Sequence, residues 1–220
     1  MPVDRDSTLK WMSLFADAMT EHRQELVRLD TAIGDGDHGT NMDRGMQKAV
    51  EKLHAEDAGD AASAADPGAI LKSVAMTLIS TVGGAAGPLY GTVFLQLGNA
   101  LAGQAEVDLP AYATAWRKAV DGVMARGKAQ PGDKTMMDAL VPAVRAAEAA
   151  ANSGEPVARA LQLAAEAARS GAEATRDMIA RYGRAKFLGE KTRGSADAGA
   201  TSMALLFQGF SAALAERKEA

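Results

Sequence analysis

Residues 29–41 read LDTAIGDGDHGTN, and this run separates two stretches of helical sequence. Its three glycines interrupt the helical period over residues 31–40. We expect one helix before the interruption, over about residues 6–30, and a second helix after it, over about residues 41–54. The apolar stripe of the first helix shows three- and four-residue spacing: Trp11, Leu14, Phe15 and Met19.

Glycine and proline indicate where the later helices begin and end. The polar stretch 55–66 is predicted to be a loop. Pro67 suits the first turn of a helix that reaches about residue 80, and Pro88 occupies the same kind of position after the glycine-rich run 83–87. Further helices are expected over residues 109–126, 133–152, 155–179 with a break at Gly171, and 199–217.

The composition and the spacing of these segments predict the fold class. Alanine, leucine, methionine, glutamate and arginine dominate, which favours an all-α fold. Roughly eight helices with short connections predict an antiparallel eight-helix bundle or barrel, and residues 1–220 are expected to form a single domain. The breaks at 31–40, 83–87, 127–133 and 183–199 are separated by one helix or by a pair, so several of them can share one end of the bundle.

The charge and the cysteine content exclude several classes of protein. The formal net charge is -4 with both signs interspersed, so the sequence lacks a basic footprint for nucleic acid. Zero cysteines exclude a disulfide framework and a thiolate metal site. The N-terminus has no apolar signal core and no stretch is long enough to span a bilayer. We therefore expect a cytoplasmic protein without membrane or nucleic-acid partners.

Asp30, Asp35 and Asp37 place three carboxylates within eight positions. Crowded carboxylates resist ionisation unless a cation compensates their charge. Magnesium binds few protein carboxylates and completes its shell with water and substrate phosphates, which suits such a short loop. A calcium-binding EF-hand needs a glutamate at the twelfth position, where this sequence has Asn41 or Met46. The sequence therefore predicts a magnesium site.

Two other interpretations of the loop stay open on its residues alone. Gly34, Gly36 and Gly39 match the Gly-x-Gly-x-x-Gly pattern of dinucleotide-binding turns, although they follow a helix and not a strand. The loop is also compatible with an exposed acidic turn whose glycines permit positive backbone angles.

Four blocks of sequence together resemble the L subunit family of dihydroxyacetone kinases. They are Gly34–Asn41, Gly83–Gly91, Gly132–Asp138 and Tyr182–Ala200, and they occur in the family's order along the whole chain. The sequence departs from the common pattern at three positions, where the family has serine at Ala86, histidine at Ser195 and proline at Ala198.

The resemblance implies an antiparallel eight-helix barrel that binds ADP or ATP at one end. Two magnesium ions would join the phosphates to Asp30, Asp35 and Asp37. Arg184 could alternatively act as a charge partner, and the resemblance assigns no catalytic residue to this chain. The positions that match nucleotide-binding residues are His38, Gly39, Thr40, Asn41, Gly83, Gly84, Ala85, Ala86, Gly127, Thr135, Met136, Arg184, Asp197, Ala198 and Gly199.

The same resemblance implies a division of labour between subunits. Phosphate would pass from the magnesium-bound nucleotide to dihydroxyacetone, which a separate K subunit holds covalently on a histidine. In one branch of the family a phosphotransferase-system M subunit rephosphorylates bound ADP, and in the other branch ATP exchanges freely. The alternatives are a kinase for another short ketose such as erythrulose, a fatty acid kinase-like transfer to a carrier-bound acyl group, and a regulatory module that binds a transcriptional regulator.

Overall fold

The computed structural model describes residues 2–57 and 66–215, and α-helices account for most of them. A short antiparallel pair joins β1 (Val3–Asp4) to β2 (Glu106–Val107), and two 3₁₀ segments, η2 (Thr175–Asp177) and η3 (Ala185–Thr192), precede the last helix. The helices are α1 (Arg5–Glu21), α2 (Arg23–Ile33), α3 (His38–Asp57), α4 (Pro67–Thr81), α5 (Ala86–Ala100), α6 (Leu109–Gly127), α7 (Met137–Asn152), α8 (Val157–Ala174) and α9 (Ala198–Ala215).

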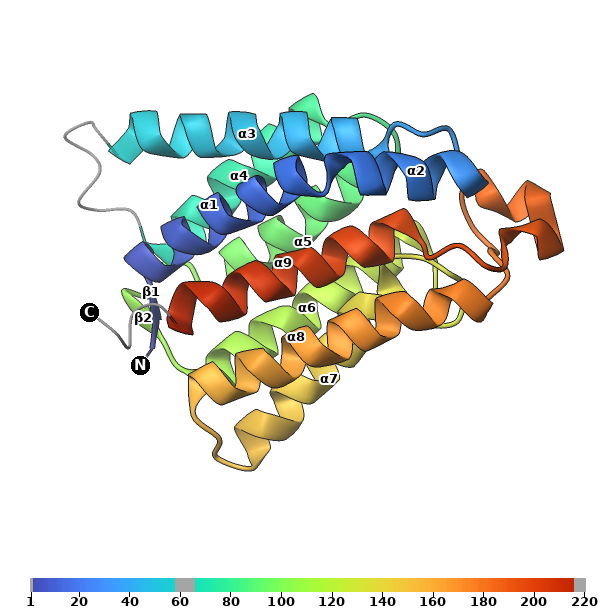
Figure 1. The fold of residues 1–220 in the computed structure, drawn as a ribbon. Coiled ribbons are helices and arrows are strands. Elements are labelled where there is room, and N and C mark those ends of the chain that lie inside the picture. The colour runs from blue at the N-terminus through green and yellow to red at the C-terminus, as the bar shows by residue number, and fades with distance from the viewer. Residues whose placement is uncertain (1, 58–65, 216–220) are drawn as a thin grey trace.

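The helices form a closed ring (Figure 1). Within the described residues, α1 and α2 make one interrupted segment, and α3 to α9 follow as alternating antiparallel segments. Each segment contacts the next one along the chain, and α9 contacts α1, which closes the ring. The structure therefore confirms the prediction of an all-α, eight-segment antiparallel barrel.

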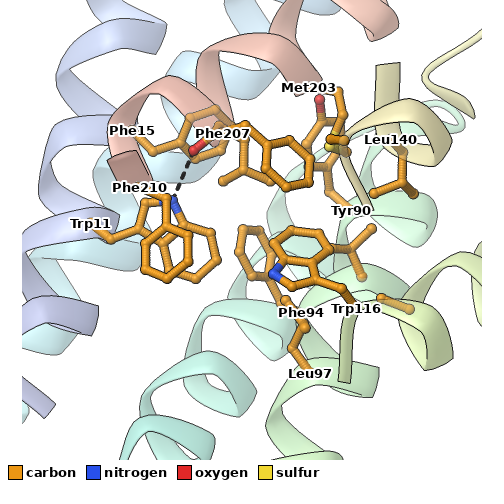
Figure 2. Close-up of a cluster of buried hydrophobic side chains, with 14 of the residues drawn as sticks. Trp11, Phe15, Tyr90, Phe94, Leu97, Trp116, Leu140, Met203, Phe207 and Phe210 are labelled. Atoms are coloured by element: carbon orange, nitrogen blue, oxygen red, sulfur yellow. Dashed lines mark hydrogen bonds between the residues drawn. The ribbon is translucent and has the colours of Figure 1, made fainter. Parts of the chain in front are cut away.

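Aromatic side chains fill the middle of the barrel (Figure 2). The ring centroids of Trp11 and Phe210 lie 4.3 Å apart, and those of Trp116 and Phe207 lie 4.6 Å apart. The indole Nε1 of Trp11 donates a hydrogen bond of 2.9 Å to the carbonyl of Leu206, so its polar atom is satisfied inside the core. Both tryptophans are buried core residues, and they link α1 and α6 to α9.

The predicted helix boundaries are wrong in the first third of the chain. The helix expected over residues 6–30 is divided at His22, where neither glycine nor proline marks the break. The next helix begins at His38, three residues earlier than predicted, and continues to Asp57 into the expected loop. The rest of that loop, 58–65, lies outside the described residues.

Several later boundaries also differ from the prediction. Helix α5 begins at Ala86, two residues before Pro88, and α7 begins at Met137 instead of residue 133. Helix α8 passes through Gly171 without the expected break and ends at Ala174. The last residues predicted for the final helix, 216–217, lie outside the described residues.

Helix α9 is the one helix among the described residues that is long and apolar enough to cross a membrane. Its most apolar window is 67% buried inside the barrel, and it contacts α1, α7 and α8. A buried central helix of a globular fold has the same composition, so this helix is weak evidence for a membrane span.

Gly171 allows α8 to approach α7 closely. A Cβ at this position would collide with the carbonyl of Asp138 and come close to the Cα of Ala139. We predict that Gly171→Ala lowers the free energy of unfolding by about 1–3 kcal/mol, because the overpacking outweighs the roughly 1 kcal/mol gain in helix propensity. Urea unfolding followed by circular dichroism measures this change. The control is Ser170→Ala at the exposed neighbouring position, where we expect the free energy of unfolding to change by no more than about 0.5 kcal/mol. A stabilised Gly171→Ala protein would contradict the account of the packing.

Candidate metal and phosphate site

A cavity of about 560 Å³ opens at one end of the barrel. All four predicted interruptions of the helical pattern contribute residues to its wall, so they do share one end of the fold. The wall combines the acidic loop, the glycine-rich connection before α5, the connection between α6 and α7, and the segment before α9.

The acidic loop brings its three carboxylates together. One oxygen each from Asp30, Asp35 and Asp37 lies within 4.8 Å of the others. The Oδ2 atom of Asp30 accepts hydrogen bonds from the amides of Asp37, at 2.9 Å, and His38, at 3.1 Å, so this carboxylate caps the N-terminus of α3. Gly34 makes room for the arrangement, because a Cβ there would collide with Oδ1 of Asp30.

The donor set fits a hard divalent cation. Asp35 and Asp37 are exposed and Asp30 is partly exposed, so water and a phosphate can complete a coordination shell in the open cavity. Arg184 reaches across from the far wall and places Nη2 at 3.0 Å from Oδ2 of Asp35. The loop therefore attracts positive charge.

The N-terminus of α5 at the cavity lacks a side-chain cap from the described residues, unlike most helices of the barrel. At the far end, Asp4, Asp66 and Asp108 cap α1, α4 and α6 with their side chains. At the cavity, among the described residues, no side chain caps α5, which begins at Ala86 after the Gly83–Ala85 turn. Its first-turn amides stay available to an anion, which a helix N-terminus favours.

Hydrogen bonds hold the ring of His38 at the cavity wall. Its Nε2 lies 2.8 Å from Oγ of Ser202, which lies 2.7 Å from the hydroxyl of Tyr90. Burial lowers the pKa of His38, and the charges of Asp30 and Asp37 oppose that change. The lowered pKa favours a neutral imidazole at neutral pH.

Asp197 lies deeper in the cavity and caps α9, because its Oδ2 accepts the amide of Ala200 at 2.7 Å. The pKa of Asp197 is raised to about 7, mainly by burial and also by Asp138, while the Ala200 amide and Lys134 act in the opposite direction. Asp138 itself accepts hydrogen bonds from the amides of Gly132 and Thr135. Two carboxylates thus organise the loops beneath the cavity.

The cavity wall includes almost all of the residues that the sequence singled out. Two positions are not among the wall residues: Gly39 is buried where a Cβ would collide with the Arg23 carbonyl of α2, and Thr40 is exposed. The predicted residues in the wall are Asp30, Asp35, Asp37, His38, Asn41, Gly83, Gly84, Ala85, Ala86, Gly127, Thr135, Met136, Arg184, Asp197, Ala198 and Gly199.

Sequence reasoning missed a second group of wall residues. Leu89, Val123 and Ala129 form apolar wall, and their helical spacing is that of ordinary core residues. Tyr182 also lines the cavity, and its hydroxyl donates to the carbonyl of Lys128 at 2.9 Å. The sequence offered one signal that Lys134 belongs to the site. It is a charged residue between Asp133 and Asp138, within the block Gly132–Asp138 that carries the family resemblance.

The helices form a closed antiparallel ring, and a carboxylate cluster and an open helix N-terminus lie together at one end of it. These features define a class of helical domain with a site suited to a cation and an anion together. Residues 32–212 match the family model described as DAK2 domain, and the chain belongs to the DAK2 domain family.

Named relatives cover nearly the whole chain. It is 41% identical over 208 residues to the PEP-dependent dihydroxyacetone kinase, ADP-binding subunit DhaL, of Escherichia coli, which covers 94% of this chain and 96% of that protein. It is 35% identical over 206 residues to the PTS-dependent dihydroxyacetone kinase, ADP-binding subunit DhaL, of Lactococcus lactis, covering 92% of this chain and 94% of that protein. It is 37% identical over 194 residues to L-erythrulose kinase of Pectobacterium atrosepticum, covering 86% of this chain but 32% of that protein.

Solved structures share the fold. The dihydroxyacetone kinase of C. freundii in its native form superposes with a TM-score of 0.72 at 24% identity. The same kinase in complex with AMP-PNP and Mg²⁺ gives a TM-score of 0.68 at 25% identity. Both matches cover 99% of this chain and 35% of that kinase, so this chain spans about a third of its length.

The raised pKa of Asp197 predicts a pH-dependent stability. Between about pH 4 and pH 7 the folded protein holds a proton that the unfolded chain has released, so the free energy of unfolding falls as the pH rises through this window. We expect a loss of roughly 2–4 kcal/mol from this group. Urea titrations of the nucleotide-free protein at a series of pH values measure it. Asp197→Asn keeps an acceptor for the Ala200 amide and flattens the profile, whereas an unchanged slope in this variant would refute the assignment.

Proposed function

We propose that this chain is the ADP- or ATP-binding subunit of a dihydroxyacetone kinase, with residues 1–220 forming one nucleotide-binding helical domain. It transfers phosphate from a magnesium-bound nucleotide to dihydroxyacetone that a separate K subunit holds. The observation that carries the proposal is the cluster of Asp30, Asp35 and Asp37 in the wall of a cavity that the open N-terminus of α5 also lines.

The residues divide the task by their chemistry. Asp30, Asp35 and Asp37 hold magnesium, in our proposal two ions, and magnesium supplies charge neutralisation for the phosphates. The amides around Gly83–Ala86 bind phosphate oxygens without changing their own charge. His38, held by Ser202, contributes a neutral polar contact beside the phosphates. Phosphoryl transfer depends mainly on such alignment and electrostatic stabilisation, so this share of the reaction needs no covalent chemistry on the chain.

The remaining wall suits the adenosine part of the nucleotide. Leu89, Val123 and Met136 offer apolar surface on one side of the cavity. The Asp197–Gly199 turn and Gly127 offer polar backbone groups beside it. A mostly apolar pocket with a few polar groups is typical of nucleotide-sized ligand sites, and the cavity of about 560 Å³ has room for one.

The identity of the phosphate donor follows from the relatives. The two relatives described above that are named as ADP-binding subunits of PEP- or PTS-dependent kinases are 41% and 35% identical and are matched over 96% and 94% of their lengths. We therefore favour rephosphorylation of bound ADP by a phosphotransferase-system M subunit over exchange with free ATP.

The acceptor and the cellular setting belong to the same proposal. An erythrulose kinase is the second candidate, because the domain is also 37% identical to a part of L-erythrulose kinase. The K subunit would then select the ketose. We further propose a cytoplasmic location, and contact with a transcriptional regulator stays a prediction that the geometry leaves untested.

Removal of one carboxylate tests the metal role. We predict that Asp35→Ala or Asp37→Ala weakens magnesium-dependent ADP binding by at least about 100-fold, because the cation loses a ligand and the phosphates lose their counter-charge. Isothermal calorimetry in magnesium measures the affinity, and circular dichroism is expected to show unchanged helix content. The exposed Asp17 of α1 gives a matched control, Asp17→Ala, with normal binding. If Asp35→Ala and Asp37→Ala both bind ADP in magnesium as tightly as the wild type, the proposal is wrong.

Retention of the nucleotide tests the choice of donor. If ADP is rephosphorylated in place, protein purified in magnesium without added nucleotide carries close to one ADP per chain, and dilution does not remove it. Mass spectrometry and chromatography of the acid-released nucleotide measure the content. An empty site, or exchange within seconds, would instead support the free-ATP branch.

A further inference from the structure

The segment between α8 and α9 extends over the open end of the cavity. We define residues 176–194 as the lid; they include η3 and appear as the orange lobe at that end of the barrel (Figure 1). Tyr182, Gly183 and Arg184 from this segment line the cavity wall. The lid is flanked by Thr175 on one side and Ser195 on the other, so the backbone at these two residues sets its position.

One buried side chain binds both of these residues. The ammonium of Lys134 donates hydrogen bonds of 2.6 Å to the carbonyl of Thr175 and 2.6 Å to the carbonyl of Ser195. Lys134 is 2% exposed and belongs to the connection between α6 and α7. A single positive charge therefore joins the two ends of the lid to the loop that forms the opposite wall of the cavity.

The other contacts between lid and loop are peripheral to this one. The amide of Arg181 donates to the carbonyl of Asp133 at 3.1 Å, and the exposed guanidinium of Arg181 lies 3.6 Å from the buried carboxylate of the same residue. The hydroxyl of Tyr182 donates to the Lys128 carbonyl. An ion pair through an exposed guanidinium is weakened by solvent, whereas a buried ammonium with short bonds to two carbonyls is costly to disrupt.

Burial and the neighbouring charges act in opposite directions on the Lys134 ammonium. The pKa of Lys134 is lowered, mainly by burial and also by Arg176, while the carboxylates of Asp197, Asp177 and Asp138 oppose the change. A buried cation is retained when its hydrogen-bonding capacity is used, and here it binds the carbonyls of both residues that flank the lid.

We propose that Lys134 is the positioning residue of the lid: its ammonium holds Thr175 and Ser195 together and thereby sets how fast a nucleotide leaves the cavity. The proposal rests on the nucleotide-binding function proposed above. Without the ammonium, the Gly194 amide still bonds the Arg176 carbonyl and the Asp197 amide still bonds the Thr175 hydroxyl. The two carbonyls of Thr175 and Ser195 lose their buried link to the connection between α6 and α7, so the lid opens more often and the nucleotide escapes faster.

The lack of cysteine in the chain allows a chemical test. Lys134→Cys is alkylated under denaturing conditions, refolded, and compared in two forms. Bromoethylamine restores an ammonium on a side chain of nearly the original length, whereas iodoacetamide leaves a neutral amide. We expect fluorescent N-methylanthraniloyl-ADP in magnesium to dissociate at least ten-fold faster from the neutral form than from wild type, and the aminoethyl form to recover most of the slow rate.

A second measurement reports on the lid without any nucleotide. The lid contains three exposed sites for chymotrypsin, at Tyr182, Phe187 and Leu188. We expect chymotrypsin to cut the neutral form at these sites faster than the aminoethyl form. The control is Lys128→Cys, at an exposed position of the connection between α6 and α7, and it receives the same two alkylations. We expect its two alkylated forms to show equal rates of nucleotide dissociation and of cleavage.

The outcomes separate this proposal from the function on which it rests. Equal dissociation and equal cleavage in the two alkylated forms of Lys134→Cys would overturn the role of Lys134. Faster cleavage with unchanged dissociation would overturn the link between the lid and nucleotide release. If wild type itself binds no nucleotide, the proposed function fails, and cleavage alone then decides whether Lys134 holds the lid.

Discussion

Repulsion among three carboxylates is the constraint around which this end of the barrel is built. Asp30, Asp35 and Asp37 meet within 4.8 Å, a distance at which like charges oppose one another unless positive charge is near. The protein supplies part of that charge itself, through the α3 amides that bind Asp30 and the Arg184 guanidinium beside Asp35. A divalent cation bound to phosphate would supply the rest, which explains why the loop faces an open cavity.

The antiparallel ring turns this local requirement into a site. Because successive segments alternate in direction, α3, α5, α7 and α9 all begin at the same end. Asp30 and Asp197 use their side chains to cap α3 and α9, whereas α5 is left open after the glycine-rich turn. The acidic loop and the open N-terminus of α5 therefore line the same cavity, above the aromatic core around Trp11 and Trp116.

The sequence predicted the features that have a local cause. Glycine and proline mark most breaks, and the acidic triad is visible as a cluster within eight positions. The division at His22 has no such mark, and the collision that makes Gly39 a packing residue depends on α2, which only the folded chain brings near. The hydrogen bonds of Lys134 to Thr175 and Ser195 could not be predicted from the sequence either, because these partners are backbone carbonyls 41 and 61 residues away.

In the proposed account, the acidic loop holds the phosphates of the nucleotide and the lid controls its exit. Direct contact between the cation and the phosphate is the central claim. Pulsed electron paramagnetic resonance of the protein with Mn²⁺ in place of magnesium and with ADP tests it most directly. The complex is first freed of unbound metal and nucleotide by gel filtration, because Mn²⁺ also binds ADP in plain solution. We predict that the Mn²⁺ retained by the protein shows a strong ³¹P coupling, since a phosphate oxygen is its ligand. Retained Mn²⁺ and retained ADP without ³¹P coupling would contradict the account.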